Sequence, residues 1–178
     1  MKSRIFVLGA VLAVQLVLAA VVNLTGEDFG IFEAEETLLS FDKNAVASLQ
    51  IDSDTDSVVL KKQAGQWLLP ENGDMPASQR DVEQLLDKLA ALEKGWPVAD
   101  TRGAAKRFRV DEAQFERKLV LVSNDDVRTT LFVGSSPGFR KVYVRLAGED
   151  EIYAVDFSTW EANAKADDWI DQDLLSID

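Results

Sequence analysis

Residues 118–156 read KLVLVSNDDVRTTLFVGSSPGFRKVYVRLAGEDEIYAVD, and this stretch decides the fold. It contains four short runs rich in β-branched and aromatic residues, namely KLVLVS, RTTLFV, KVYVRL and EIYAVD. Short segments containing Gly, Asn or Asp separate these runs, as turns between strands do. Because such short turns join antiparallel neighbours, the stretch predicts an antiparallel meander of four strands.

Three more strand-like runs, AVASLQID, SVVLKKQ and QWLL, precede the meander within residues 45–69. In the first run apolar and polar residues alternate, so Ala47, Leu49 and Ile51 are expected to face a core. The pair Ala64-Gly65 lies between the second and third runs and predicts a hairpin.

Residues 79–94 carry the strongest helix pattern in the chain. Ser78 with Asp81 resembles a capping box, which satisfies backbone N–H groups at a helix start. Gly95 predicts the end of the helix. Apolar residues recur every three or four positions and form one face: Val82, Leu85, Leu86, Leu89 and Leu92. This amphipathic face is expected to pack on the sheet.

The predicted fold is therefore α+β, with mainly antiparallel strands, one amphipathic helix and a short helical tail. Residues 103–109 are expected to add no more than one or two helical turns. The tail begins with a second capping-box sequence, Ser158-Thr159-Trp160-Glu161. Short helical pieces are expected around Trp169 and Leu174-Leu175.

Residues 5–24 (IFVLGAVLAVQLVLAAVVNL) carry no charge and are long enough for one transmembrane helix. Lys2 and Arg4 precede the run and acidic residues follow it, which predicts a cytoplasmic N-terminus and a periplasmic remainder. A cleaved signal peptide is the alternative, although the run is longer than a typical signal core and no A-x-A site follows. We expect a single-pass protein of the bacterial inner membrane. Its predicted parts are a cytoplasmic tip (1–4), the anchor (5–24), an acidic juxtamembrane linker (25–44) and a periplasmic α+β domain (45–178).

Three residues inside the predicted anchor are candidates for packing against another helix. Gly9 and Ala13 form a small-xxx-small pair, which allows close approach of a neighbour. Gln15 lies near the middle, where its amide favours a polar partner over lipid. The alternative is that a single span simply tolerates these residues.

The composition excludes several classes of chemistry. The chain has no Cys and no His, so thiol catalysis, iron–sulfur ligation, the usual zinc sites and a Ser–His–Asp triad are ruled out. Residues 25–178 hold 17 basic and 31 acidic residues, which argues against binding of nucleic acid. We expect neither an enzyme nor a cofactor or metal. A hydrolase that uses paired carboxylates stays open, because Asp and Glu are abundant.

Two basic groups are candidate contacts for a protein partner. The loop GSSPGFRK places Phe139, Arg140 and Lys141 at the expected tip of a hairpin. Its likeness to a phosphate-binding loop is weak, because the G-K-[ST] ending is missing and a strand follows. The second group comprises Arg102, Lys106 and Arg109, which would share one face if helical. The alternative for this group is pairing with carboxylates of the same domain.

Two other patterns have structural interpretations. Asp52, Asp54 and Asp56 resemble the start of a calcium loop, but Ser57 and Gln63 replace the expected Gly and Glu, so a solvated turn is preferred. The tryptophans are interpreted as core or rim residues, with a sugar-stacking platform as the alternative: Trp67, Trp96, Trp160 and Trp169.

Several segments in order resemble one known family. They are LLSFD (38–42), GQWLLP (65–70), LLDKLAAL (85–92), GWPVAD (95–100), AAKRFRV (104–110), FERKL (115–119), LFVGSSPGFRKVYVR (131–145) and ADDWID (166–171). Together they resemble the bacterial domain-of-unknown-function family numbered 4340, over residues 38–175. The resemblance implies a membrane-anchored periplasmic protein associated with ABC transporters of the gliding-motility auxiliary kind. It implies no catalytic residue.

The function expected from the sequence is that of a non-catalytic, membrane-anchored periplasmic accessory subunit of a membrane protein complex. The resemblance implies an ABC transport system, so the expected partners are a permease or auxiliary chain, with lipid around the anchor. The alternative is a periplasmic binding module for envelope glycan or lipid.

Overall fold

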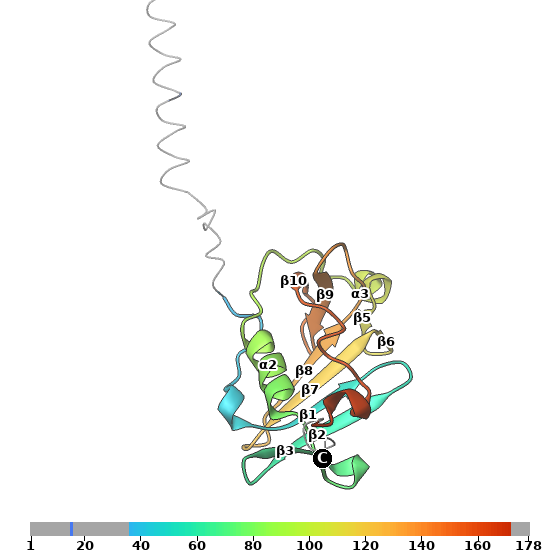
Figure 1. Cartoon of the computed structure of the whole chain (residues 1–178). Helices are drawn as coiled ribbons and strands as arrows, with labels where there is room; N and C mark the ends of the chain where they lie inside the picture. The colour runs from blue at the N-terminus through green and yellow to red at the C-terminus, as the bar shows by residue number, and fades with distance from the viewer. Residues whose placement is uncertain (1–14, 16–35, 172–178) are drawn as a thin grey trace, which may run out of the picture. The chain divides into compact units, whose positions relative to one another are not determined.

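The computed structural model describes Gln15 and residues 36–171, which form the sheet and helices of Figure 1. Within these residues the fold is α+β, as predicted, with one eight-stranded antiparallel sheet in the order β10-β9-β8-β7-β1-β2-β3-β4. The strands of this sheet are β1 (Val46–Asp52), β2 (Ser57–Gln63), β3 (Gln66–Leu69), β4 (Met75–Pro76), β7 (Arg117–Ser123), β8 (Arg128–Val133), β9 (Lys141–Leu146) and β10 (Ile152–Asp156). A small ribbon pairs β5 (Val110–Asp111) with β6 (Gln114–Phe115), and the α-helices are α2 (Gln79–Ala90) and α3 (Arg102–Phe108).

The predicted meander is confirmed. Strands β7, β8, β9 and β10 follow one another both along the chain and across the sheet, and every adjacent pair is antiparallel. The predicted hairpin is also present, with β2 and β3 joined at Ala64-Gly65. The two groups of strands join where β1 pairs with β7, so a single continuous sheet spans the domain.

One strand differs from its predicted side-chain pattern. Leu49 and Ile51 are fully buried, as expected, but Val46 rather than Ala47 is buried at the start of β1. The register between β1 and β7 shifts between Val46 and Ser48, so Ala47 is an extra residue. This bulge reverses the alternation of inward and outward side chains, because each residue added to a strand changes the face.

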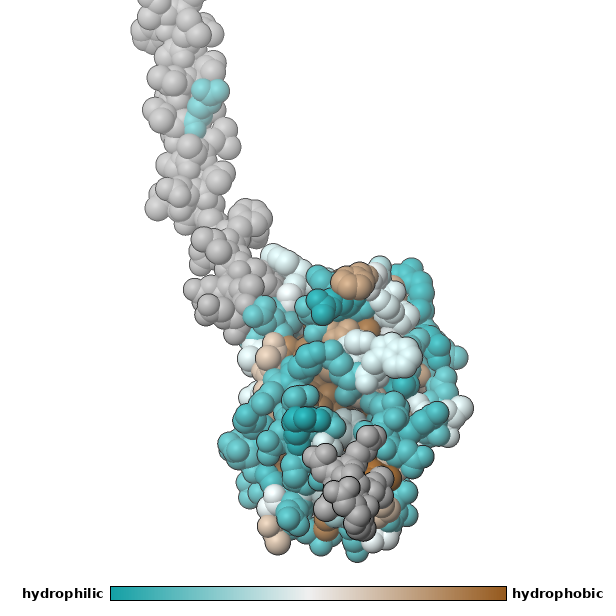
Figure 2. Space-filling model, in the orientation of Figure 1, coloured by the Kyte–Doolittle hydropathy of each residue, from teal (hydrophilic) through white to brown (hydrophobic). Residues whose placement is uncertain are grey.

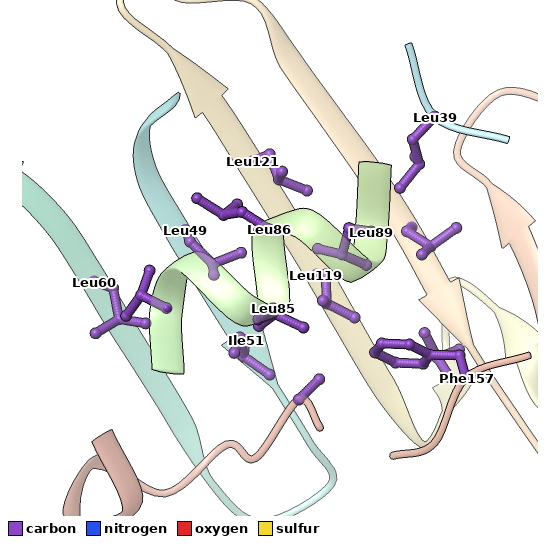
Figure 3. Close-up of a cluster of buried hydrophobic side chains, with 14 of the residues drawn as sticks. Leu39, Leu49, Ile51, Leu60, Leu85, Leu86, Leu89, Leu119, Leu121 and Phe157 are labelled. Carbon is purple, nitrogen blue, oxygen red and sulfur yellow. The ribbon is translucent and has the colours of Figure 1, made fainter. Parts of the chain in front are cut away.

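Helix α2 packs on one face of the sheet and forms the main core (Figure 3). Ser78 accepts a hydrogen bond from the Asp81 N–H, so the predicted N-cap is confirmed. Leu85, Leu86 and Leu89 project from the helix toward the sheet. The strand residues that meet them include Leu49, Ile51, Leu60, Leu119 and Leu121.

Helix α2 ends at Ala90, four residues before the predicted end. After Ala90 the chain turns to pair with residues 36–38, since the N–H of Leu38 donates to the Leu92 carbonyl (2.7 Å) and that of Lys94 to the Glu36 carbonyl (2.7 Å). Leu92 is nevertheless buried, as predicted, although it lies beyond the end of the helix. Leu38 and Leu39 are also buried in the main core, which therefore includes part of the segment before residue 45.

The described domain contains a second, short α-helix, α3, where one or two helical turns were expected at residues 103–109. Thr101 caps α3 by accepting a hydrogen bond from the Ala104 N–H (3.2 Å). Ala104 and Ala105 belong to a second core cluster with Phe132 and Ile152, whose side chains alternate with those of the main core. Helix α3 therefore covers the opposite face of the sheet from α2.

The C-terminal segment closes one edge of the sheet. A 3₁₀ helix at Ala166–Trp169 confirms the predicted helical piece at Trp169, whereas residues 158–161 form a turn and not a helix start. Ala77, just after β4, forms a bridge with Ile170, and the Asp171 N–H donates to the Pro76 carbonyl (3.1 Å). The predicted helical piece at residues 174–175 lies outside the described residues.

No helix among the residues that the structure describes is both long and apolar enough to cross a membrane. The predicted anchor at residues 5–24 lies outside the described residues except for Gln15, which is helical. Gly9 and Ala13 lie outside them as well.

Candidate functional site

The end of the loop between β8 and β9, together with the first residue of β9, presents an aromatic side chain and two cations, which we call the tip (Phe139, Arg140 and Lys141). Phe139 is 90% exposed, and the Arg140 guanidinium lies 5.6 Å from the centre of its ring. Ser136 shapes the loop, because its hydroxyl accepts from the Gly138 N–H (3.2 Å) and lies 2.6 Å from the Lys141 carbonyl oxygen. The tip is therefore an ordered surface feature that exposes a large apolar group to solvent.

Beside the tip lies a hollow of about 950 Å³, which we call the edge hollow. One wall is the free edge of the sheet at residues 154–156, and another is the segment that follows α2, at residues 91–95. The tip forms a third wall. The surface in Figure 2 is mainly hydrophilic, with apolar side chains showing between the hydrophilic ones, so large exposed apolar groups such as Phe139 are exceptions.

The edge hollow has a small excess of positive charge in an acidic domain. Its lining includes four cations and three carboxylates: Lys88, Lys94, Arg140, Lys141, Glu93, Asp156 and Glu161. Of the four cations, only Lys88 forms an ion pair within the described part of the chain, with Glu161. Partial burial lowers the pKa of Lys94, but Tyr153 and Glu149 outweigh that effect and hold the pKa above its usual range. The ammonium also lies 5.5 Å from the Tyr153 ring centre, so Lys94 stays charged in this wall.

A second hollow of about 660 Å³ lies between α2 and the C-terminal segment, and we call it the helix hollow. Trp160 is 86% exposed at its rim, whereas Trp169 is buried and donates from Nε1 to the Asn163 carbonyl (2.7 Å). Acidic side chains line this hollow, including Asp81, Asp87 and Asp168. Lys88 and Glu161 line both hollows, so their ion pair lies between the two.

The second predicted basic group is divided by the end of α3. Arg109 lies just beyond the helix in a left-handed conformation, and its guanidinium pairs with Asp54 (2.9 Å) and Glu116 (3.3 Å). This geometry agrees with the alternative of pairing inside the domain. Arg102 and Lys106 are exposed on α3 and form no ion pair with any residue in the described range 36–171.

The Asp52–Asp56 segment forms a turn between β1 and β2. The Ser53 N–H donates to the Asp56 carbonyl (2.8 Å), and Asp54 is turned toward Arg109. Among the described residues no three Asp, Glu, His or Cys side chains are grouped as metal ligands. The hydrogen bond within the segment and the exposed ion pair of Asp54 are those of a surface turn.

Asp52 is the one carboxylate of this turn that is bound on several sides. Its oxygens accept from Ser57 (2.7 Å), Gln50 (2.8 Å) and Lys118 (3.1 Å). Burial raises the pKa of Asp52, but these three donors together outweigh it and bring the pKa below its usual range. The ionised carboxylate is therefore favoured in the folded state.

We expect Asp52→Asn to destabilise the domain at pH 7 by about 1 kcal/mol, because the charged acceptor is lost. A lowered pKa contributes stability above the unfolded value of about 3.9 and loses it as pH falls through the folded value. The gap between the variant and the unchanged protein should therefore shrink on acidification below about pH 4. Thermal unfolding at several pH values measures this gap, and a gap that stayed constant with pH would contradict the assignment.

Sequence reasoning identified the tip but missed the surfaces around it. The edge position of β10 follows from strand order, and the placement of Lys94 follows from the early end of α2. The only sequence signal for the edge was that EIYAVD is the last strand of the meander. Trp160 was noticed as a tryptophan, but nothing local showed that it is exposed.

Comparison with known proteins gives one match. The sequence model of a family described as a domain of unknown function (DUF4340) matches residues 67–178, more than half of the chain. The matched region includes the tip, β10 and α2. No curated protein and no solved structure matches the chain.

Proposed function

The chain belongs to the DUF4340 family of domains of unknown function, as its sequence segments indicated, and from this premise we propose that it is a non-catalytic, membrane-anchored periplasmic accessory subunit of a membrane protein complex. The complex in this proposal is an ABC transport system. The transporter assignment rests on the resemblance described above and the anchor on the apolar run at residues 5–24. The binding role rests on the surface of the domain.

The observation that carries the binding role is the exposed tip. Phe139 is 90% exposed, so it leaves a large apolar surface in water beside the edge hollow. Aromatic residues and Arg are enriched at the centres of protein interfaces, where they contribute much of the binding energy. The tip combines both types beside a hollow, as an anchor residue and its surrounding charges would.

A second candidate function, the binding of envelope glycan, is favoured by the helix hollow. Trp160 offers an exposed ring, and Asp81, Asp87 and Asn163 offer acceptors or donors for hydroxyl groups. Sugar binding combines a flat apolar face with such polar groups. In this case the ligand would lie against Trp160 and not against the tip.

The partner-binding proposal is tested with the full-length protein in its own cells. A photoreactive phenylalanine analogue replaces Phe139, and irradiation precedes membrane solubilisation in mild detergent. We expect an adduct with another membrane protein, identified by mass spectrometry, at a yield at least about tenfold above the control position, as a hot-spot contact would give.

The control carries the same analogue at Val127, which is 63% exposed in the turn between β7 and β8. It matches Phe139 as an exposed apolar residue on a loop of the same sheet but lies at the other end of β8. Equal yields at both positions, or a protein that elutes alone from several mild detergents, would refute partner binding at the tip. Glycan recovered with the protein and dependent on Trp160 would favour the second candidate.

A further inference from the structure

The two edges of the eight-stranded sheet are not equivalent. At β4 the edge is closed, because the Ala77–Ile170 bridge and the Asp171 N–H cover it. At β10 only the first residue is covered: Ile152 donates to the Ala99 carbonyl (2.8 Å) and accepts from the Val98 N–H (2.7 Å). The rest of β10 forms a wall of the edge hollow.

The direction of the backbone groups along β10 follows from this contact. The N–H and C=O of Ile152 point away from β9, and residues two apart in a strand point the same way. The opposite strand agrees, since Tyr143, the partner of Ala154, uses its N–H and C=O toward Gly134 and Ser135. The N–H and C=O of Ala154 therefore point out of the sheet, and no described residue hydrogen-bonds them.

The segment that covers Ile152 does not cover Ala154. It pairs through Val98 and Ala99, and among the described residues no hydrogen bond joins it to Ala154. The segment around Gly95 instead forms the far wall of the edge hollow.

We propose that the edge of β10 at Ala154 receives an extended, acidic segment of a partner protein as an added strand, with an apolar side chain of that segment against Phe139. The addition of a strand supplies backbone hydrogen bonds for affinity, while side chains at alternate positions supply specificity. This inference rests on the proposed function and specifies how the partner binds.

The charge of the edge hollow favours an acidic partner segment. Lys94, Arg140 and Lys141 approach the edge from two walls of the hollow, and none of them has an ion-pair partner among residues 36–171. Glu93 and Asp156 also line the hollow, so its excess of positive charge is small, but it stands out in a chain whose net charge is −12. A hollow of about 950 Å³ has room for several side chains of such a segment.

The test compares substitutions at Ala154 in the full-length protein that carries the photoreactive analogue at position 139. Ala154→Pro removes the outward N–H and leaves the ladder to β9 intact, so we expect the adduct yield to fall at least about tenfold. Ala154→Val keeps the N–H and suits a strand, so it should retain the adduct. Both variants should melt within a few degrees of the unchanged protein.

A second pair of variants keeps the inference testable if the proline impairs folding. Lys141→Glu reverses a charge of the edge hollow and should reduce the adduct at least about tenfold, whereas Arg128→Glu, an exposed change on β8, should not. Full adduct yield in a folded Ala154→Pro or in Lys141→Glu would overturn strand addition and leave the proposed function standing. An adduct with a second copy of this chain would overturn the choice of partner. Absence of any adduct in the parent protein would refute the proposed function and this inference with it.

Discussion

Gly134→Ala should destabilise the domain by about 3 kcal/mol, because the added methyl group has no space. A Cβ atom at this position would lie 2.6 Å from the Arg109 carbonyl oxygen and closer still to that of Phe108. Both oxygens belong to backbone at the end of α3, so no side chain can rotate away. The sheet and α3 must separate, which also weakens the hydrogen bond from the Ser135 N–H to the Phe108 carbonyl (2.8 Å).

Thermal unfolding of the full-length protein in detergent measures this effect, and a fall in Tm of about 10 °C is expected. Gly138→Ala is the matched control, since a Cβ there meets no atom within 4 Å in the same loop. If the two substitutions lowered the Tm equally, close packing of the loop against α3 could not be the cause.

Arg145→Ala should destabilise the domain by about 3 kcal/mol, because two backbone carbonyls, one buried and one partly buried, lose one shared donor. Arg145 is only 8% exposed, and Nε donates to the Val110 carbonyl (2.8 Å) while Nη1 donates to that of Glu149 (2.9 Å). Its guanidinium also lies 5.0 Å from the Phe132 ring centre. The side chain thereby ties the small β5–β6 ribbon and the β9–β10 turn to the second core cluster.

Arg145→Lys separates geometry from charge. Lysine keeps the positive charge but presents it at one point, so it cannot reach both carbonyls as the planar guanidinium does. We therefore expect Lys to restore less than half of the stability lost with Ala, measured by chemical or thermal unfolding. Arg128→Ala, on the exposed part of β8, should change the stability by less than about 0.5 kcal/mol. Full rescue by Lys would show that charge alone matters.

The meander was predictable because its information is local. Each run alternates or concentrates apolar residues over a few positions, and the short turns between runs leave antiparallel pairing as the only connection. The N-cap at Ser78 was predictable for the same reason, since Ser78 and Asp81 interact over three residues. These features need no knowledge of the rest of the chain.

The features that failed depend on distant residues. The end of α2 is set by residues 36–38, which form hydrogen bonds with the backbone of residues 92–94. Those residues therefore do not form another helical turn. The helical turns at residues 103–109 were expected, but the place where α3 packs was not, because it is set by Phe132 and Ile152, which lie far along the sequence. No window around either helix contains these partners.

The candidate site likewise has one part that local sequence predicts and one part that it does not. The tip could be predicted, because a turn sequence with Phe139, Arg140 and Lys141 must expose them. The hollow beside it could not, because its walls come from α2, β10 and the loop, and their order across the sheet is a property of the complete fold. Arg145, an apparently surface-facing cation in KVYVRL, is buried for that reason too.

The closure of the β4 edge by Ile170 and Asp171 limits what assembly through strand pairing can produce. A sheet with two free edges can template a copy of itself at each end and grow into a filament. Because the β4 edge is closed, only the β10 edge can pair with another strand. Growth by strand pairing therefore stops after one association. Copies of this domain would therefore not polymerise through their sheets.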